Sequence, residues 1–92
     1  MIISDDVENK FKIRNWQDLS VIKIVEHNFG YLRCGYSYPE QNIVVLGIKN
    51  NLVEFNFEKM EITKSLRIKN AVIYIEKVNN DIFLISEWHG FI

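Results

Sequence analysis

The chain has a single cysteine, Cys34, and a single proline, Pro39, among its 92 residues. One cysteine cannot form an internal disulfide, whereas a small secreted domain usually carries several. Four glycines and 48% hydrophobic residues also exclude collagen-like and low-complexity chains. These absences predict a protein that folds around its own core and resides in the cytoplasm.

An excess of charge of one sign is also missing. Eleven Lys and Arg residues balance twelve Asp and Glu residues, which leaves a net charge of −1. Proteins that bind nucleic acid usually carry a basic excess, because phosphate contacts supply most of their affinity. The basic residues of 10–14 and 67–69 are interpreted as solvated strand faces. The charge balance therefore argues against nucleic acid as the partner.

Long hydrophobic runs are absent as well. The longest are 43–48 and 71–75, far shorter than the roughly 20 residues of a membrane-spanning helix. The first residues, Met-Ile-Ile followed by Ser4, lack the basic and apolar regions of a signal peptide. We therefore expect a cytoplasmic protein without a membrane partner.

What the sequence does contain is apolar alternation with a period of two. This pattern, bounded by turn-forming residues, predicts hairpins over 21–36, 43–57 and 71–88, and a strand over 60–69 that is broken near Lys64. The only candidates for helix are single turns at residues 4–8 and 15–19. Residues 1–92 should form one all-β domain, an antiparallel β-sandwich or partly open barrel of about seven or eight short strands.

Residues that could carry catalysis or hold a metal are few. His27, His89 and Cys34 do not have the spacing of a zinc site, and the four glycines are too scattered for a phosphate-binding loop. We expect no metal, no cofactor and no enzymatic activity, with Cys34 a small core residue. A small hydrolase that uses His27 or His89, both expected to be exposed, remains an alternative.

Aromatic and acidic residues near predicted loops are the strongest functional signal. Tyr36, Tyr38 and Glu40 surround Pro39, and Glu87 and Trp88 lie near the C-terminus. Tyrosine and tryptophan are common anchors of protein interfaces, because they bury a large area at a low entropic cost. These five residues are the predicted partner-binding site.

The chain resembles the small all-β immunity proteins of bacterial contact-dependent growth inhibition and related polymorphic toxin systems. The shared features are the length, an abundance of Asn, Ile and Lys, the lack of an active-site motif, and the aromatic and acidic loop residues. The resemblance implies a cytoplasmic antitoxin-type protein that binds one cognate toxin domain and blocks its active site. If the toxin is a nuclease, the candidate partners for its basic residues are Glu40, Glu54, Glu76, Asp81 and Glu87.

Two further classes of function fit the same features. One is a phage-encoded inhibitor of a host defence enzyme, which would bind its target in the same way. The other is a β-barrel that binds single-stranded nucleic acid by stacking bases on the aromatic rings, with an affinity that falls steeply with salt.

Overall fold

The computed structural model describes residues 2–79 and 82–88, and this part of the chain forms nine strands. They are β1 (Ile2–Val7), β2 (Lys10–Arg14), β3 (Val21–Glu26), β4 (Leu32–Tyr38), β5 (Ile43–Ile48), β6 (Asn51–Asn56), β7 (Glu61–Arg67), β8 (Val72–Asn79) and β9 (Ile82–Glu87). A short 3-10 helix, η1 (Pro39–Gln41), joins β4 to β5. The all-β prediction is confirmed, with slightly more strands than expected.

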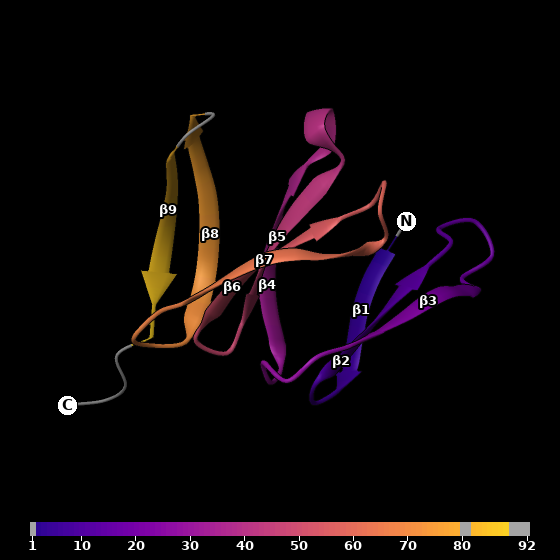
Figure 1. The fold of residues 1–92 in the computed structure, drawn as a ribbon, viewed down its shortest axis with the longest axis horizontal. Coiled ribbons are helices and arrows are strands. Elements are labelled where there is room, and N and C mark those ends of the chain that lie inside the picture. Colours follow the sequence, from indigo (N-terminus) through magenta and orange to yellow (C-terminus); the bar gives the residue numbers. More distant parts are fainter. Residues whose placement is uncertain (1, 80–81, 89–92) are drawn as a thin grey trace.

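The strands form three antiparallel sheets, each a meander in chain order. They are the N-terminal sheet (β1-β2-β3), the central sheet (β4-β5-β6-β7) and the C-terminal hairpin (β8-β9). The three follow one another along the long axis of the molecule, with the central sheet between the other two (Figure 1). Each sheet is therefore built from neighbouring segments of sequence.

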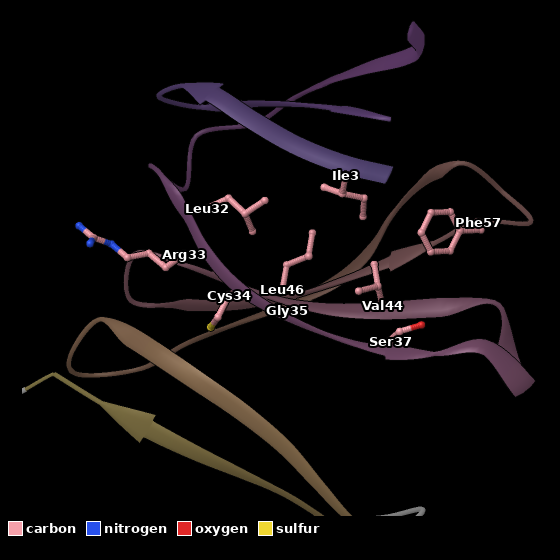
Figure 2. A pocket seen from close by; sticks show the side chains of 9 residues that line it. All are labelled: Ile3, Leu32, Arg33, Cys34, Gly35, Ser37, Val44, Leu46 and Phe57. Carbon is pink, nitrogen blue, oxygen red and sulfur yellow. The ribbon is translucent and has the colours of Figure 1, made fainter. Parts of the chain in front are cut away.

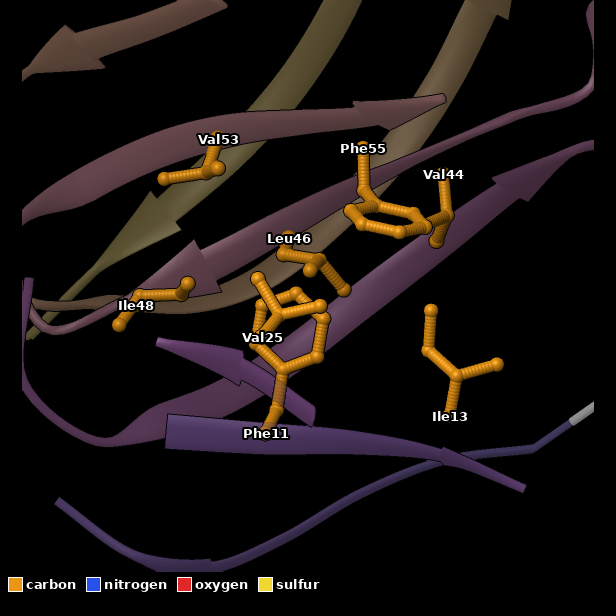
Figure 3. Close-up of a cluster of buried hydrophobic side chains, with 8 residues drawn as sticks. All are labelled: Phe11, Ile13, Val25, Val44, Leu46, Ile48, Val53 and Phe55. Carbon is orange, nitrogen blue, oxygen red and sulfur yellow. The ribbon is translucent and has the colours of Figure 1, made fainter. Parts of the chain in front are cut away.

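The main core lies between the N-terminal sheet and the central sheet (Figure 3). Its buried members are Phe11, Ile13, Val25, Val44, Leu46, Ile48, Val53 and Phe55. The rings of Phe11 and Phe55 meet across the two sheets edge to face, with centroids 5.6 Å apart. Burial of these apolar side chains is the main favourable contribution to folding.

The C-terminal hairpin packs on the opposite face of the central sheet. Side chains alternate along β5, so Val44 and Leu46 face the core while Ile43, Val45 and Gly47 face the hairpin. β8 lies against β4 and β5, and its Val72 is fully buried. The result is a three-layer stack, with the N-terminal sheet on one face of the central sheet and the hairpin on the other.

Several local predictions are confirmed. β5 pairs with β6, and β8 with β9, as the hairpins over 43–57 and 71–88 require. The strand over 60–69 is β7, and its pairing with β6 shifts register between Lys64 and Ile62. This bulge is the break that the sequence predicts near Lys64.

The hairpin predicted over 21–36 is wrong. β3 pairs with β2, and β4 pairs with β5 in another sheet. The connection between β3 and β4 is held instead by Asn9, in the β1–β2 turn. Asn9 donates its N–H to Gly30 O (3.0 Å), accepts the Gly30 N–H on Oδ1 (2.8 Å), and accepts the His27 N–H on its carbonyl oxygen (3.0 Å). These contacts direct the chain away from β3 and towards the central sheet.

Two smaller predictions are also wrong. Residues 2–7 form strand β1 rather than a helical turn, because they pair with β2. His27 is not an exposed turn residue: its ring is half-buried, 5.6 Å from the Phe11 ring and 5.4 Å from the Phe29 ring. Its Nδ1 accepts the Phe29 N–H at 3.1 Å. His27 therefore acts as part of the packing in this structure.

Candidate partner-binding surface

Tyr36 and Tyr38, two of the predicted partner-binding residues, lie on β4 and contact the C-terminal hairpin. β4 extends through Tyr38, so neither tyrosine belongs to a loop. Both rings meet the Phe83 ring of β9 edge to face, with centroids 6.0 and 6.2 Å apart. Tyr38 is only 3% exposed. It therefore has little surface to offer a partner while the hairpin is docked.

Glu40 belongs to the same contact. The Lys77 ammonium lies 2.9 Å from Glu40 Oε1 and 3.6 Å from the centre of the Tyr38 ring. The pKa of Glu40 is lowered, first by a backbone hydrogen bond and then by Lys77. Desolvation acts to lower the pKa of Lys77, but its hydrogen bonds to Glu40 and Tyr38 raise it overall. The ion pair thus fastens β8 to η1.

We expect the variant Glu40→Gln to be less stable than the wild type at neutral pH and nearly equal to it in acid. The folded-state pKa of Glu40 lies below its usual value of 4.5, so its carboxylate stabilises the fold fully above pH 4.5. That contribution is lost as the pH falls through the lower, folded-state pKa. Urea titrations across this range measure the difference, with Glu58→Gln in the β6–β7 turn as the charge-matched control. A difference that persists unchanged in acid would contradict this role of Glu40.

Glu87 and Trp88, the other two predicted residues, lie at the opposite end of the hairpin. Glu87 Oε1 accepts the backbone N–H of Asn70 at 3.1 Å, and the backbone N–H of Trp88 donates to the carbonyl oxygen of Ala71 at 2.8 Å. These bonds tie the end of β9 to the segment that enters β8. Trp88 is 54% exposed.

The five predicted residues therefore form two groups. Tyr36, Tyr38 and Glu40 gather around Phe83 and Lys77, while Glu87 and Trp88 lie near the start of β8. The eight residues of β8 span about 25 Å at the usual rise of a strand. One contiguous patch does not contain all five, and the hairpin is the element that connects them.

Sequence reasoning missed the exposed apolar residues of this hairpin. Tyr74 and Leu84 lie on the face opposite Ile75 and Phe83, because side chains alternate along paired strands. The full set of exposed large apolar residues on the hairpin, together called the outer hairpin surface, is Ile73 (47%), Tyr74 (51%), Val78 (61%), Ile82 (52%), Leu84 (53%) and Trp88 (54%). In soluble proteins, large contiguous patches of exposed apolar residues are typical of interaction sites.

A register shift explains why the pattern was misread. The sequence places Ile73 and Ile75 on one face, but the pairing of β8 with β9 shifts between Val72 and Tyr74. As a consequence Val72 and Ile75 are both buried while Ile73 is exposed. The sequence does contain a signal for these exposed residues, because β8 is apolar on both of its faces. The hairpin packs on one sheet only, so one of these apolar faces is left exposed.

The described part of the hairpin carries more acidic than basic residues. Its described residues, 72–79 and 82–88, carry two carboxylates, Glu76 and Glu87, and one lysine, Lys77, which Glu40 engages. Asp81 lies outside the described residues. Glu54, another acidic candidate, lies on β6, where it accepts the Thr63 hydroxyl at 2.6 Å. The acidic character of the hairpin thus comes from Glu76 and Glu87.

The chemistry available elsewhere in the described residues is limited. They contain no group of three or more His, Cys, Asp or Glu residues placed to hold a metal ion. Cys34 is half-buried beside Gly47 and Val72, and burial raises the pKa of its thiol. A raised pKa disfavours the thiolate, which is the nucleophilic form. His89 lies outside the described residues.

Comparison with protein-family models, with curated proteins and with solved structures gives no match to this chain. No helix among the described residues is long and apolar enough to cross a lipid bilayer. The geometry of the chain itself is therefore the basis on which its function is inferred.

Proposed function

We propose that this protein is a non-catalytic cytoplasmic inhibitor that binds a cognate toxin domain, as immunity proteins do. The observation that supports it best is the outer hairpin surface: exposed apolar residues accompanied by the exposed Glu76, with the half-buried Glu87 next to Trp88 in the chain. Such a surface suits a partner whose apolar contacts are surrounded by lysine and arginine. A toxin domain with a basic substrate cleft, such as a nuclease, has that character.

The size of the molecule permits such binding. A standard interface uses about 800 Å² of each partner, roughly one eighth of the 6336 Å² accessible here. Trp88 and Tyr74 are suitable anchors because aromatic side chains dominate interface energies. The carboxylates contribute mainly to the association rate and to partner choice. In this proposal Tyr36, Tyr38 and Glu40 act by positioning the hairpin.

We expect Trp88→Ala to weaken binding to the cognate toxin domain about tenfold or more, the usual loss for an interface anchor. The toxin candidate is the product of the adjacent upstream gene, and titration calorimetry measures the dissociation constant. Growth of cells that express the toxin domain gives a second readout, since the wild-type protein restores growth and the variant restores it less well. The matched control is Trp16→Ala, which removes a 71% exposed tryptophan from the N-terminal sheet region.

Other results would reject the proposal. Equal losses for Trp88→Ala and Trp16→Ala would remove the hairpin from the interface. Failure to bind the neighbouring gene product, together with binding of a single-stranded oligonucleotide that weakens steeply with salt, would favour the nucleic-acid alternative. Stoichiometric capture of a host enzyme instead of a toxin would favour the phage-inhibitor alternative.

A further inference from the structure

The N-terminal sheet and the central sheet repeat one strand pattern. The first residues of β1 and β5, Ile2 and Ile43, are 41 positions apart, as are those of β2 and β6. The first residues of β3 and β7, Val21 and Glu61, are 40 positions apart. In both sheets these three strands are consecutive, antiparallel neighbours. β1, β2 and β3 are therefore the structural equivalents of β5, β6 and β7.

The C-terminal hairpin continues the repeat. The first residues of β4 and β8, Leu32 and Val72, are 40 positions apart, and those of β5 and β9, Ile43 and Ile82, are 39 apart. One unit of four strands thus recurs about every 40 residues. Among the described residues the central sheet holds all four strands, the hairpin holds the first two, and the N-terminal sheet holds the last three. Repetition of a four-stranded sheet along the chain is also how the blades of β-propellers are built.

In the part of the chain that the structure describes, the N-terminal sheet accordingly has no counterpart of β4. In the central sheet β4 pairs with the outer edge of β5. Among the described residues, no strand pairs with the corresponding edge of β1. A groove of about 530 Å³ lies at this place, between Ile3 of β1 and the length of β4 (Figure 2).

The lining of the groove fits a strand. Gly35 and Ser37 face the N-terminal sheet, because they pair with Leu46 and Val44 of the core face. Their small side chains leave Val44, Leu46 and Phe57 as an apolar lining. The opposite face of β4 is covered by β8. A strand at the edge of β1 would cover the core-facing side of β4 in the same way.

We propose that this groove binds one extended strand of a partner polypeptide, which pairs with the edge of β1. The equivalent strand, β4, specifies the chemistry of the occupant. β4 presents Cys34, Tyr36 and Tyr38 at alternate positions to the hairpin, so the occupant presents apolar or aromatic side chains at alternate positions to Gly35 and Ser37. Main-chain hydrogen bonds to β1 supply affinity, and the lining selects the side chains.

This site is independent of the proposed toxin-binding surface, because it lies on the other face of the central sheet. The edge of β1, with which no strand in 2–79 or 82–88 pairs, gives a second reason for an occupant. An exposed strand edge readily pairs with another chain, and natural proteins usually block such edges. Here the edge adjoins a groove rather than a covering loop.

The test uses a capped, fluorescein-labelled peptide with the sequence of residues 31–38, in which serine replaces the cysteine. We expect saturable binding in the fluorescence anisotropy of the peptide, and at least tenfold slower hydrogen exchange in the amides of β1. The variant Ser37→Trp fills the groove and should weaken binding tenfold or more. Ser65→Trp is the matched control, because Ser65 is an exposed serine on β7, the other edge strand of the same sheet.

A second arm joins the same eight residues to the N-terminus of the full chain through a four-residue linker, the length of the 39–42 connection between β4 and β5. The fusion raises the local concentration of the strand, and should raise Tm by about 4 °C or more. A fused strand with proline at its centre should leave Tm unchanged, because proline has no backbone N–H to donate to β1. Absence of peptide binding, equal binding to the two tryptophan variants, no protection of β1, or an unchanged Tm of the fusion would each overturn the proposal.

Discussion

Phe55→Ala should lower the free energy of unfolding by about 3–5 kcal/mol, the usual cost of truncating a fully buried phenylalanine. Phe55 has no accessible surface and lies on β6, an interior strand of the central sheet. Its ring contacts Phe11 across the two sheets and Phe57 in the turn that follows β6, with centroids 5.6 and 5.4 Å away. The cavity left by alanine would be bounded by two sheets, so no single side chain can fill it.

Urea titration and thermal unfolding measure this effect. A domain of this size should lose about 12 °C or more in Tm, at 4–8 °C for each kcal/mol. The matched control is Tyr74→Ala, which removes an aromatic ring that is 51% exposed on the hairpin and should change stability by about 0.5 kcal/mol or less. Equal effects of the two substitutions would contradict the placement of the core between the N-terminal and central sheets.

The parts of the fold that the sequence predicts correctly depend on neighbouring residues. The β5–β6 hairpin is an example: an apolar run reaches Ile48, the turn follows at Lys49 and Asn50, and alternation resumes in β6. Lys49 adopts a positive φ of 54° at this turn. A local turn of this kind fixes the pairing of the two strands that it joins.

The strand pairing that the sequence predicts wrongly depends on a distant residue. The segment between β3 and β4 has the composition of a hairpin turn, but Asn9 binds the backbone at His27 and Gly30. That contact joins positions about 20 residues apart, and no local periodicity reports it. Two apolar strands separated by a short polar segment were therefore assigned to one hairpin although they belong to two sheets.

The candidate site shows the same division. The sequence identifies residue types that suit a protein interface. Of these residues, Trp88 is exposed and Glu87 is half-buried in the structure. The sequence also selects Tyr38, whose ring the hairpin covers. Alternation shows which side chains share a face of β4, but not that β9 will pack on that face. The outer hairpin surface was missed because a register shift in β8 exchanges the buried and exposed positions.

The contact that positions the proposed binding surface depends on Gly47, and Gly47→Ala should lower the free energy of unfolding by about 1–3 kcal/mol, as overpacking does. A Cβ at this position would lie 2.6 Å from Cys34 Sγ and 3.0 Å from Val72 Cβ, so the Cys34 side chain must turn away and the contact between β8 and β5 must loosen. Gly35→Ala is the matched control on the other face, where the nearest atom to the new methyl group is the flexible end of Leu46, at 3.1 Å. Urea titration measures the loss, and hydrogen exchange should show faster exchange in β8 and β9 for Gly47→Ala alone.

Because the hairpin carries Tyr74 and Trp88, the same substitution should weaken binding to the proposed toxin domain without altering any residue of the outer hairpin surface. Slower or unchanged exchange in β8 would show that the close approach of Gly47 to Val72 does not hold the hairpin in place.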